Sequence, residues 1–270
     1  MKRFLSRRPV FLFSVVASLV VPGVAFGNFI EFAVGGDTTT ASIQATVDAF
    51  RAAAGAPNNG NAPGTVGGRR EINWDGGSTN NFTVATAGTP FNGFLDTRGA
   101  QFTTPGTGFV QAPPAELDPL VFGVFSLQRI FSPIGSNITD VSFFIPGTNG
   151  SVPATVSGFG AIFTDVNRDD SLSSTTLEFF GISNNLIFHQ AVPIGVTSKQ
   201  SLSFLGAIGN AGEEISRVRI TTGNTPFDLV AMDDFIYPEP QRVPESGGIG
   251  LMVLGLGFVL LCYRRFVPVS

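Results

Sequence analysis

The chain has 270 residues, of which 43% are hydrophobic and 13% are charged, and it contains a single cysteine. One cysteine excludes a disulfide within the chain, so stability outside a cell has to come from packing or from bound ions. Residues 28–243 hold 19 of the 20 acidic residues but only ten of the 16 basic ones. The resulting charge of about −9 disfavours nucleic acid as a partner, because phosphate binding needs clustered Lys and Arg.

Residues 1–27 have the layout of a secretory signal peptide. Four basic residues lie within the first eight positions, an apolar run covers Val10–Val21, and small residues precede Asn28. The sequence therefore predicts cleavage between Gly27 and Asn28, and hence export. The alternative is an uncleaved N-terminal anchor, but the apolar run is shorter than the roughly 20 residues that a membrane span needs.

Residues 28–68 are expected to form a helical lead-in and a linker. Apolar residues recur with the spacing of one helical face at Ile43, Val47, Phe50 and Ala54. A Thr or Asp between positions 37 and 40 can cap the start of this helix, and Gly55 can end it. The Gly- and Pro-rich residues 55–68 then indicate a loop.

Residues 69–237 are expected to form the main domain. Short apolar runs rich in Val, Ile, Thr and Phe follow one another here at intervals of roughly 8 to 15 residues, with turn residues between them. This spacing is typical of an antiparallel β-sandwich or barrel. The segment 215–221 shows the strand alternation, with one step slipped as at a bulge. The sequence therefore predicts an all-β fold.

Residues 238–270 form a tail that differs from the domain before it. Residues 248–263 are apolar and uncharged, and as a helix they would span about 25 Å, close to the roughly 30 Å of a bilayer core. They are predicted to be a transmembrane helix, with Arg264 and Arg265 on the cytoplasmic side. The alternative is a buried helix of the domain, which the many glycines of this segment disfavour.

Five residues precede the apolar segment as a motif: Val243, Pro244, Glu245, Ser246 and Gly247. Followed by a Gly-rich apolar helix and two arginines, this motif resembles the PEP-CTERM class of bacterial sorting tails, most closely the variant that reads Val-Pro-Asp-Ser-Gly. Glu245 replaces the Asp of that variant, and residues 266–270 trail the arginines. A literal Pro-Glu-Pro at residues 238–240 lies too far from the apolar segment to serve as the motif.

The resemblance to sorting tails implies partners and a location. A membrane sorting enzyme, an exosortase, would recognise residues 243–247 and remove the tail. The protein would first be anchored in the membrane and then reach the cell surface or the extracellular polymer. Segments such as GRREINWDG and MDDFIY also resemble a widespread set of secreted proteins with the same kind of tail. That second resemblance implies a jelly-roll-like β-sandwich and no known activity.

Three carboxylates are candidates for a structural calcium site. Asp233 and Asp234 lie in the last predicted strand and Asp75 lies near the first, and jelly-roll modules often hold Ca²⁺ between these two strands. The alternative is that Asp233 and Asp234 cap a strand end and bond to backbone amides. Asp165, Asn167 and Asp169 have the spacing of EF-hand ligands, but the Gly and Glu that an EF-hand also needs are missing, which favours a solvated turn.

The sequence lacks the parts of a nucleophilic enzyme. It has no Gly-x-Ser-x-Gly motif, its one thiol is in the tail, and its one histidine, His189, is expected to pack in a strand among apolar neighbours. A glycoside hydrolase needs only two carboxylates, and its candidates are Glu178, Glu213 and Glu214.

Trp74 and Tyr237 are candidates for a sugar-stacking surface, with core packing as the alternative for both. The predicted function is a cell-surface or extracellular-matrix protein with a structural or adhesive role and no enzymatic activity. A carbohydrate-binding module that contacts extracellular polysaccharide is the alternative, and a glycoside hydrolase is a distant third.

Overall fold

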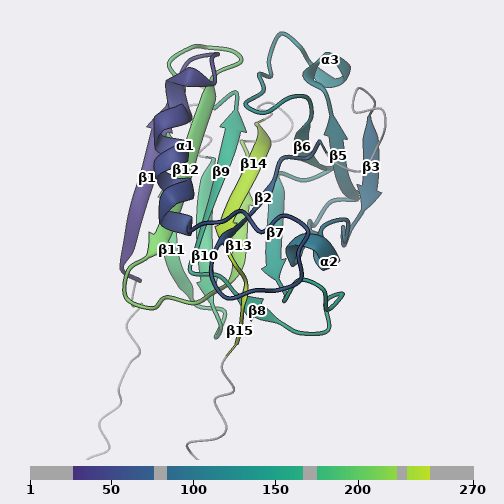
Figure 1. The fold of residues 1–270 in the computed structure, drawn as a ribbon. Helices are drawn as coiled ribbons and strands as arrows, with labels where there is room; N and C mark the ends of the chain where they lie inside the picture. Colours follow the sequence, from purple (N-terminus) through teal and green to yellow (C-terminus); the bar gives the residue numbers. More distant parts are fainter. Residues whose placement is uncertain (1–26, 76–83, 167–174, 224–229, 244–270) are drawn as a thin grey trace, which may run out of the picture.

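A computed structural model describes residues 27–75, 84–166, 175–223 and 230–243 of the protein. These residues form two β-sheets packed face to face, a small two-stranded sheet and few helices (Figure 1). Every named pair of strands within the described residues is antiparallel. The predicted all-β sandwich is thereby confirmed.

The larger sheet contains eight strands. In spatial order these are β1 (Phe29–Gly35), β12 (Leu202–Gly209), β9 (Gly158–Thr164), β14 (Ala231–Pro238), β6 (Ile130–Ile134), β5 (Gly108–Ala112) and β3 (Ala85–Gly88), and β2 (Arg69–Ile72) also pairs with β14. The facing sheet consists of β11 (Leu186–Ala191), β10 (Thr176–Gly181), β13 (Ile215–Thr221), β7 (Ile138–Phe143) and β4 (Ala100–Thr103).

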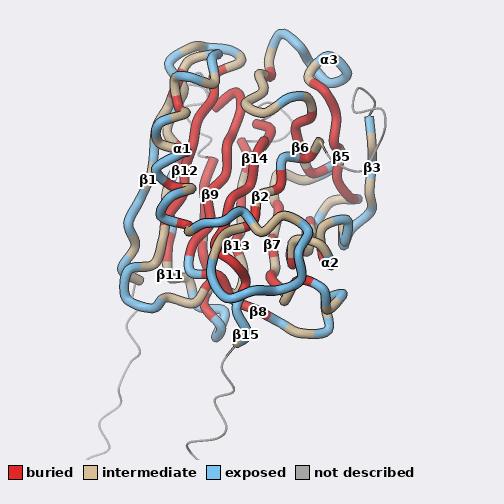
Figure 2. Tube along the Cα trace, in the orientation of Figure 1, coloured by how far each residue is buried: buried red, intermediate tan, exposed pale blue. Residues whose placement is uncertain are grey.

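The remaining elements are short, apart from one helix. The small sheet pairs β8 (Ala154–Thr155) with β15 (Gln241–Arg242), and the helices are α1 (Ala41–Ala54), α2 (Leu95–Arg98) and α3 (Pro114–Leu117). Figure 2 shows the buried residues concentrated along the central strands β9, β12 and β14.

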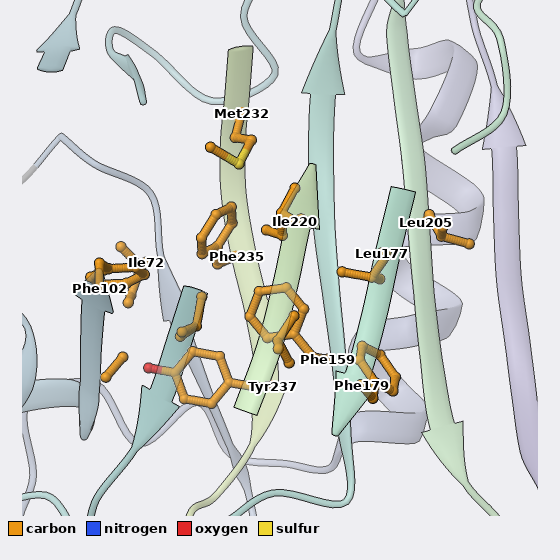
Figure 3. Close-up of a cluster of buried hydrophobic side chains, with 14 of the residues drawn as sticks. Ile72, Phe102, Phe159, Leu177, Phe179, Leu205, Ile220, Met232, Phe235 and Tyr237 are labelled. Carbon is orange, nitrogen blue, oxygen red and sulfur yellow. The ribbon is translucent and has the colours of Figure 1, made fainter. Parts of the chain in front are cut away.

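The core between the two sheets is largely aromatic. Phe143 of the five-stranded sheet lies 5.3 Å from the ring of Tyr237 in the eight-stranded sheet, and Phe159 stacks on Tyr237 at 6.1 Å. Figure 3 shows Phe235 and Tyr237 from β14 among the side chains of the facing strands. Many of the Phe residues in the described part of the chain therefore lie in the interior of the sandwich.

Helix α1 covers the outer face of the eight-stranded sheet over β1 and β12 (Figure 1). Its buried residues are those of the predicted face, Ile43, Val47, Phe50 and Ala54, and Gly55 ends it with φ of 102°. Gly206 of β12 admits the ring of Phe50, because a methyl group there would stand 2.8 Å from a ring carbon. The expected helix is confirmed, although Thr40 at its start makes no side-chain capping bond.

Strand β1 lies in the segment that was expected to be only helix and linker. It pairs along its whole length with β12, from Phe29 opposite Gly209 to Gly35 opposite Ser203. The β-sandwich therefore begins ahead of α1, at Phe29, and includes an edge strand that the sequence analysis did not identify.

A β-bulge interrupts strand β14 between Met232 and Phe235. Two residues, Asp233 and Asp234, occupy the place of one in the pairing with β9. On its other edge β14 changes neighbour at the same place, because Met232 pairs with β6 and the residues from Phe235 onward pair with β2.

Candidate functional site

The last strand pair among the described residues lies directly before the predicted sorting motif. The last strand pair joins Arg242 of β15 to Ala154 of β8, and Val243, the first residue of the motif, is the last described residue. Residues 244–247 of the motif, the apolar segment 248–263 and the basic pair 264–265 lie outside the described residues. The folded domain thus extends to the residue immediately before the motif.

A buried ion pair fixes the chain just before this junction. Both carboxylate oxygens of Glu239 accept hydrogen bonds from Arg70, from Nε and Nη2 at 2.6 Å each, and neither side chain is exposed to solvent. Glu239 is the central residue of the literal Pro-Glu-Pro sequence. This sequence therefore belongs to the packed domain rather than to an accessible signal.

The same ion pair holds the linker after α1. Nη1 of Arg70 donates to the carbonyl oxygens of Gly60 and Ala62, both at 2.7 Å. Asn59 donates from its side-chain amide to Glu239 at 2.7 Å, and the backbone N–H of Thr65 donates to the same carboxylate at 3.1 Å. The loop expected over residues 55–68 is thus tied to β2 and β14 through a network in which the buried charges are satisfied.

The other end of the described chain also meets a carboxylate. The backbone N–H of Asn28 donates to Oε1 of Glu213 at 2.6 Å, and the N–H of Gly27 donates to the carbonyl of Ile187 at 2.8 Å. Partial burial raises the pKa of Glu213, but hydrogen bonds from backbone amides, including those of Ala211 and Asn28, outweigh this and lower it overall. Glu213, a candidate hydrolase residue in the sequence, therefore anchors the start of β1.

The bulge in β14 places two buried carboxyl groups side by side. Asp233 is completely buried and Asp234 is 3% exposed. The hydroxyl of Ser126 donates to both, at 3.2 Å to Asp233 and 2.6 Å to Asp234, and the N–H of Phe125 donates to Asp233 at 2.7 Å. Arg51 of α1 reaches Asp234 at 3.4 Å. Asp233 thus accepts a backbone N–H group, as the alternative to calcium binding expects.

Asp75 holds the same loop from its other end. Its Oδ1 accepts the backbone N–H groups of Gln128 at 2.5 Å and Arg129 at 2.9 Å. The three predicted calcium ligands therefore lie at two ends of the segment 125–129 and face N–H and O–H donors. Among the described residues no group of three or more His, Cys, Asp or Glu side chains is placed to hold a metal ion. Calcium binding at these residues stays a prediction.

Burial raises the pKa of Asp233 well above its ordinary value, and the neighbouring carboxyl of Asp234 raises it further. Burial also raises the pKa of Asp234, against the lowering effects of Ser126 and Arg51, while Glu71 of β2 adds to the rise. The folded protein thus retains protons on this pair at pH values where the unfolded chain has lost them.

The aspartate pair predicts a dependence of stability on pH. Its contribution is complete below the unfolded pKa, near the ordinary value of 3.8, and is lost as the pH rises through the raised folded pKa. Asp233→Asn resembles the protonated form, so we expect its melting temperature to fall less than that of the wild type as the pH rises above about 4. Melting curves recorded across this range measure the difference, and equal slopes for the two proteins would contradict the assignment.

The outer face of the five-stranded sheet carries a row of paired charges. Asp140 accepts Nη1 of Arg217 at 2.7 Å and Nη2 of Arg219 at 2.8 Å, and Glu178 lies 3.3 Å from Nδ1 of His189. The side chain of His189 is 50% exposed, so the expectation that it packs among apolar neighbours is wrong. The reason is that β11 is an edge strand whose His189 is paired with Glu178 on the solvent side.

Trp74 and Tyr237 are both completely buried. Trp74 stacks on Phe131 at 3.8 Å and donates from its indole N–H to the carbonyl of Asp233 at 2.9 Å. The hydroxyl of Tyr237 donates to the carbonyl of Arg98 at 3.0 Å. Neither ring is accessible to a sugar, so the core-packing alternative applies to both.

The other candidate positions are only partly described. Asp165 follows β9 and is 5% exposed, whereas Asn167 and Asp169 lie outside the described residues, as do residues 1–26 of the predicted signal peptide. No helix in the described part of the chain is long and apolar enough to cross a membrane. No protein-family model matches this chain, and neither curated proteins nor solved structures give a significant match.

Proposed function

We propose that the protein is exported and that its C-terminal tail sorts it to the cell surface or the extracellular matrix, where the β-sandwich has a structural or adhesive role. The observation that carries the proposal is the position of the last strand pair. β15 ends at Arg242, and the sequence resembling a sorting motif starts at the next residue. A cut within residues 243–247 would therefore leave the packed domain whole.

The partners in this proposal are the membrane and an exosortase-type enzyme. Residues 248–263 would cross the bilayer as a helix, and Arg264 and Arg265 would stay on the cytoplasmic side. Pro244 keeps the motif out of regular secondary structure, which suits a segment that an enzyme has to bind in extended form.

Export requires removal of residues 1–27, and the hydrogen bond between Asn28 and Glu213 supports cleavage at this point. After cleavage the backbone nitrogen of Asn28 becomes an ammonium group. Its bond to the Glu213 carboxylate, 2.6 Å long, then joins two opposite charges and becomes stronger. The new amino terminus would thus find a partner already in place.

We further propose that the sandwich is of the jelly-roll-like type that the sequence resemblance implies. Its support is the antiparallel pairing of the strands in two sheets that share one aromatic core.

An intact-mass measurement on protein recovered from the cell surface or the medium tests the proposal. We expect a chain that begins at Asn28 and ends within residues 243–247. Replacing both Arg264 and Arg265 with Glu should reduce processing, because the charges that hold the tail on the cytoplasmic side are reversed.

Lys199→Glu provides the control, since it reverses a charge on the exposed surface of the domain and should not affect processing. A mass that includes residues 249–270 would show a plain membrane anchor and would overturn sorting by cleavage. A chain that still begins at Met1 would overturn export through a cleaved signal peptide.

A further inference from the structure

A pocket of about 380 Å³ opens where the larger sheet divides. Ile72 of β2 pairs with Phe235, whereas Gln111 of β5 is connected through Phe131 of β6 to Met232. The two rims of the pocket are thus set by β14 on the two sides of its bulge, and α2 with the residues before it forms a wall. Its volume lies within the range of small-molecule sites, roughly 300 to 1,000 Å³.

Arg98 is the positively charged group of this pocket, which Glu71 also lines. Its Nε donates to the carbonyl of Glu71 at 2.9 Å and its Nη1 donates to Oδ1 of Asn61. Among the described residues no carboxylate lies within ion-pair distance of Arg98, unlike Arg51, Arg69 and Arg70 nearby. Burial, the largest influence, lowers its pKa, and the positive charge of Arg70 acts in the same direction. A half-buried cation that has no ion pair among the described residues, while the carboxylate of nearby Glu71 is paired with Arg51 and Arg69, favours an anionic ligand.

Gln111 supplies a second polar group to the pocket. Its side chain lines the pocket, the residue is only 9% exposed, and its amide has no hydrogen-bond partner among the described residues. The amide opens on the pocket, so water can hydrogen-bond to it in the free protein, and a ligand hydroxyl can take the place of that water. Asn73 lines the same pocket and likewise has no side-chain hydrogen bond within the described part of the chain. The pocket thus presents two neutral donor–acceptor groups.

Two rings form the apolar wall of the pocket, Phe91 and Phe94. Phe94 meets the buried indole of Trp74 edge-on, with ring centroids 5.5 Å apart, and is backed by the aromatic core. Packing against Trp74 therefore holds Phe94 in place. The two rings offer an apolar surface to the C–H groups of a ligand ring.

We propose that this pocket binds a sugar unit that carries a carboxylate, a uronic acid. Arg98 recognises the carboxylate, Gln111 and Asn73 recognise hydroxyl groups, and Phe91 and Phe94 contact the apolar face of the sugar ring. If the protein is adhesive, as proposed above, its ligand through this site is an acidic polysaccharide. The pocket belongs to the folded domain and does not depend on whether the tail is cut. A negative result in the binding test therefore leaves the sorting proposal standing, and the reverse also holds.

Titration of the exported protein with galacturonic acid and its trimer, and with galactose as the neutral match, tests the site. Trp74 is the only tryptophan in the chain and touches the pocket wall through Phe94, so its fluorescence reports occupancy alongside calorimetry. We expect the trimer to bind, and galactose to bind at least about tenfold more weakly than galacturonic acid, as the loss of a charge-assisted bond implies.

Two variants address the recognising groups. Arg98→Gln and Gln111→Leu should each weaken binding of the trimer about tenfold or more. Arg242→Gln, at an exposed arginine on β15, and Gln190→Leu, on β11, are matched controls that should leave the affinity unchanged. Melting curves establish that each variant is folded. Should Arg98→Gln fail to fold, Arg98→Lys keeps the charge without the planar fork and should still weaken binding.

Three results would overturn the proposal. The first is no binding of the trimer by the folded protein at millimolar concentration. The second is equal affinity for galactose and galacturonic acid, which would remove the role of Arg98. The third is a loss of affinity in the Arg242 or Gln190 controls as large as in the pocket variants, which would place binding elsewhere.

Discussion

Replacing Glu239 with Gln is expected to lower the free energy of unfolding by about 3 to 5 kcal/mol, the usual cost of leaving one member of a buried ion pair without its partner. The change keeps the size of the side chain but removes the charge that faces Arg70, whose guanidinium has no exposure to water. Denaturant unfolding of the wild type and the variant measures the difference. Glu116→Gln, at an exposed position in α3, is the control and should change stability by less than about 0.5 kcal/mol.

The double variant Arg70→Met with Glu239→Leu removes both charges. It therefore separates the loss of stability caused by one unpaired charge from the stability that the ion pair itself contributes. Buried ion pairs replaced by apolar residues of similar volume often cost little, so the double variant should be more stable than Glu239→Gln alone. The carbonyl oxygens of Gly60 and Ala62 would lose their donor, which keeps a residual cost. A Glu239→Gln variant as stable as the wild type would show that the pair is not buried as described.

Replacing Phe50 with Ala should cost a similar amount, about 3 to 5 kcal/mol, because it removes the ring that attaches α1 to the sheet. That ring is fully buried and meets Phe32 at 5.5 Å and Phe204 at 5.3 Å, edge-on in both cases. Little can fill the space, since the wall opposite consists of glycine residues on β9 and β12.

Thermal and denaturant unfolding of Phe50→Ala provide the measurement, and Leu127→Ala is the comparison. Leu127 is 77% exposed, so its truncation should change the free energy of unfolding by less than about 0.5 kcal/mol. Equal effects of the two substitutions would mean that α1 contributes little to the stability of the sandwich.

The elements that could be predicted from the sequence are those whose pattern is local. The helix face of Ile43, Val47 and Phe50 is a repeat of 3.6 residues within one segment, and it is buried as expected. Strand β1 shows no clean alternation, because Phe32 and Val34 pack with α1 and Phe29 packs on the sandwich core, while the residues between them are exposed. A short strand without clean alternation cannot be distinguished by period from a piece of helix.

The candidate site residues show the same limit. Asp233 and Asp234 could be selected from the sequence as unusual acids in a strand, but their shared burial depends on a bulge set by pairing with β9. The pairing of Arg70 with Glu239 joins residues 169 positions apart, and nothing near either of them indicates it. In the sequence Gln111 is one polar residue in a short, mostly apolar strand, and only the arrangement of the divided sheet shows that its amide opens on a pocket.

The junction at β15 also determines how the domain responds to mechanical load. A protein held at its C-terminal end is pulled through Arg242, and the two-residue pairing of β15 with β8 peels first. The force then acts on Glu239, which is bound to Arg70. It also acts on β14, which is hydrogen-bonded to other strands along both of its edges. The load thus falls on the middle of the sheet, where many bonds have to shear together, and the domain resists extension from the end by which it would be tethered.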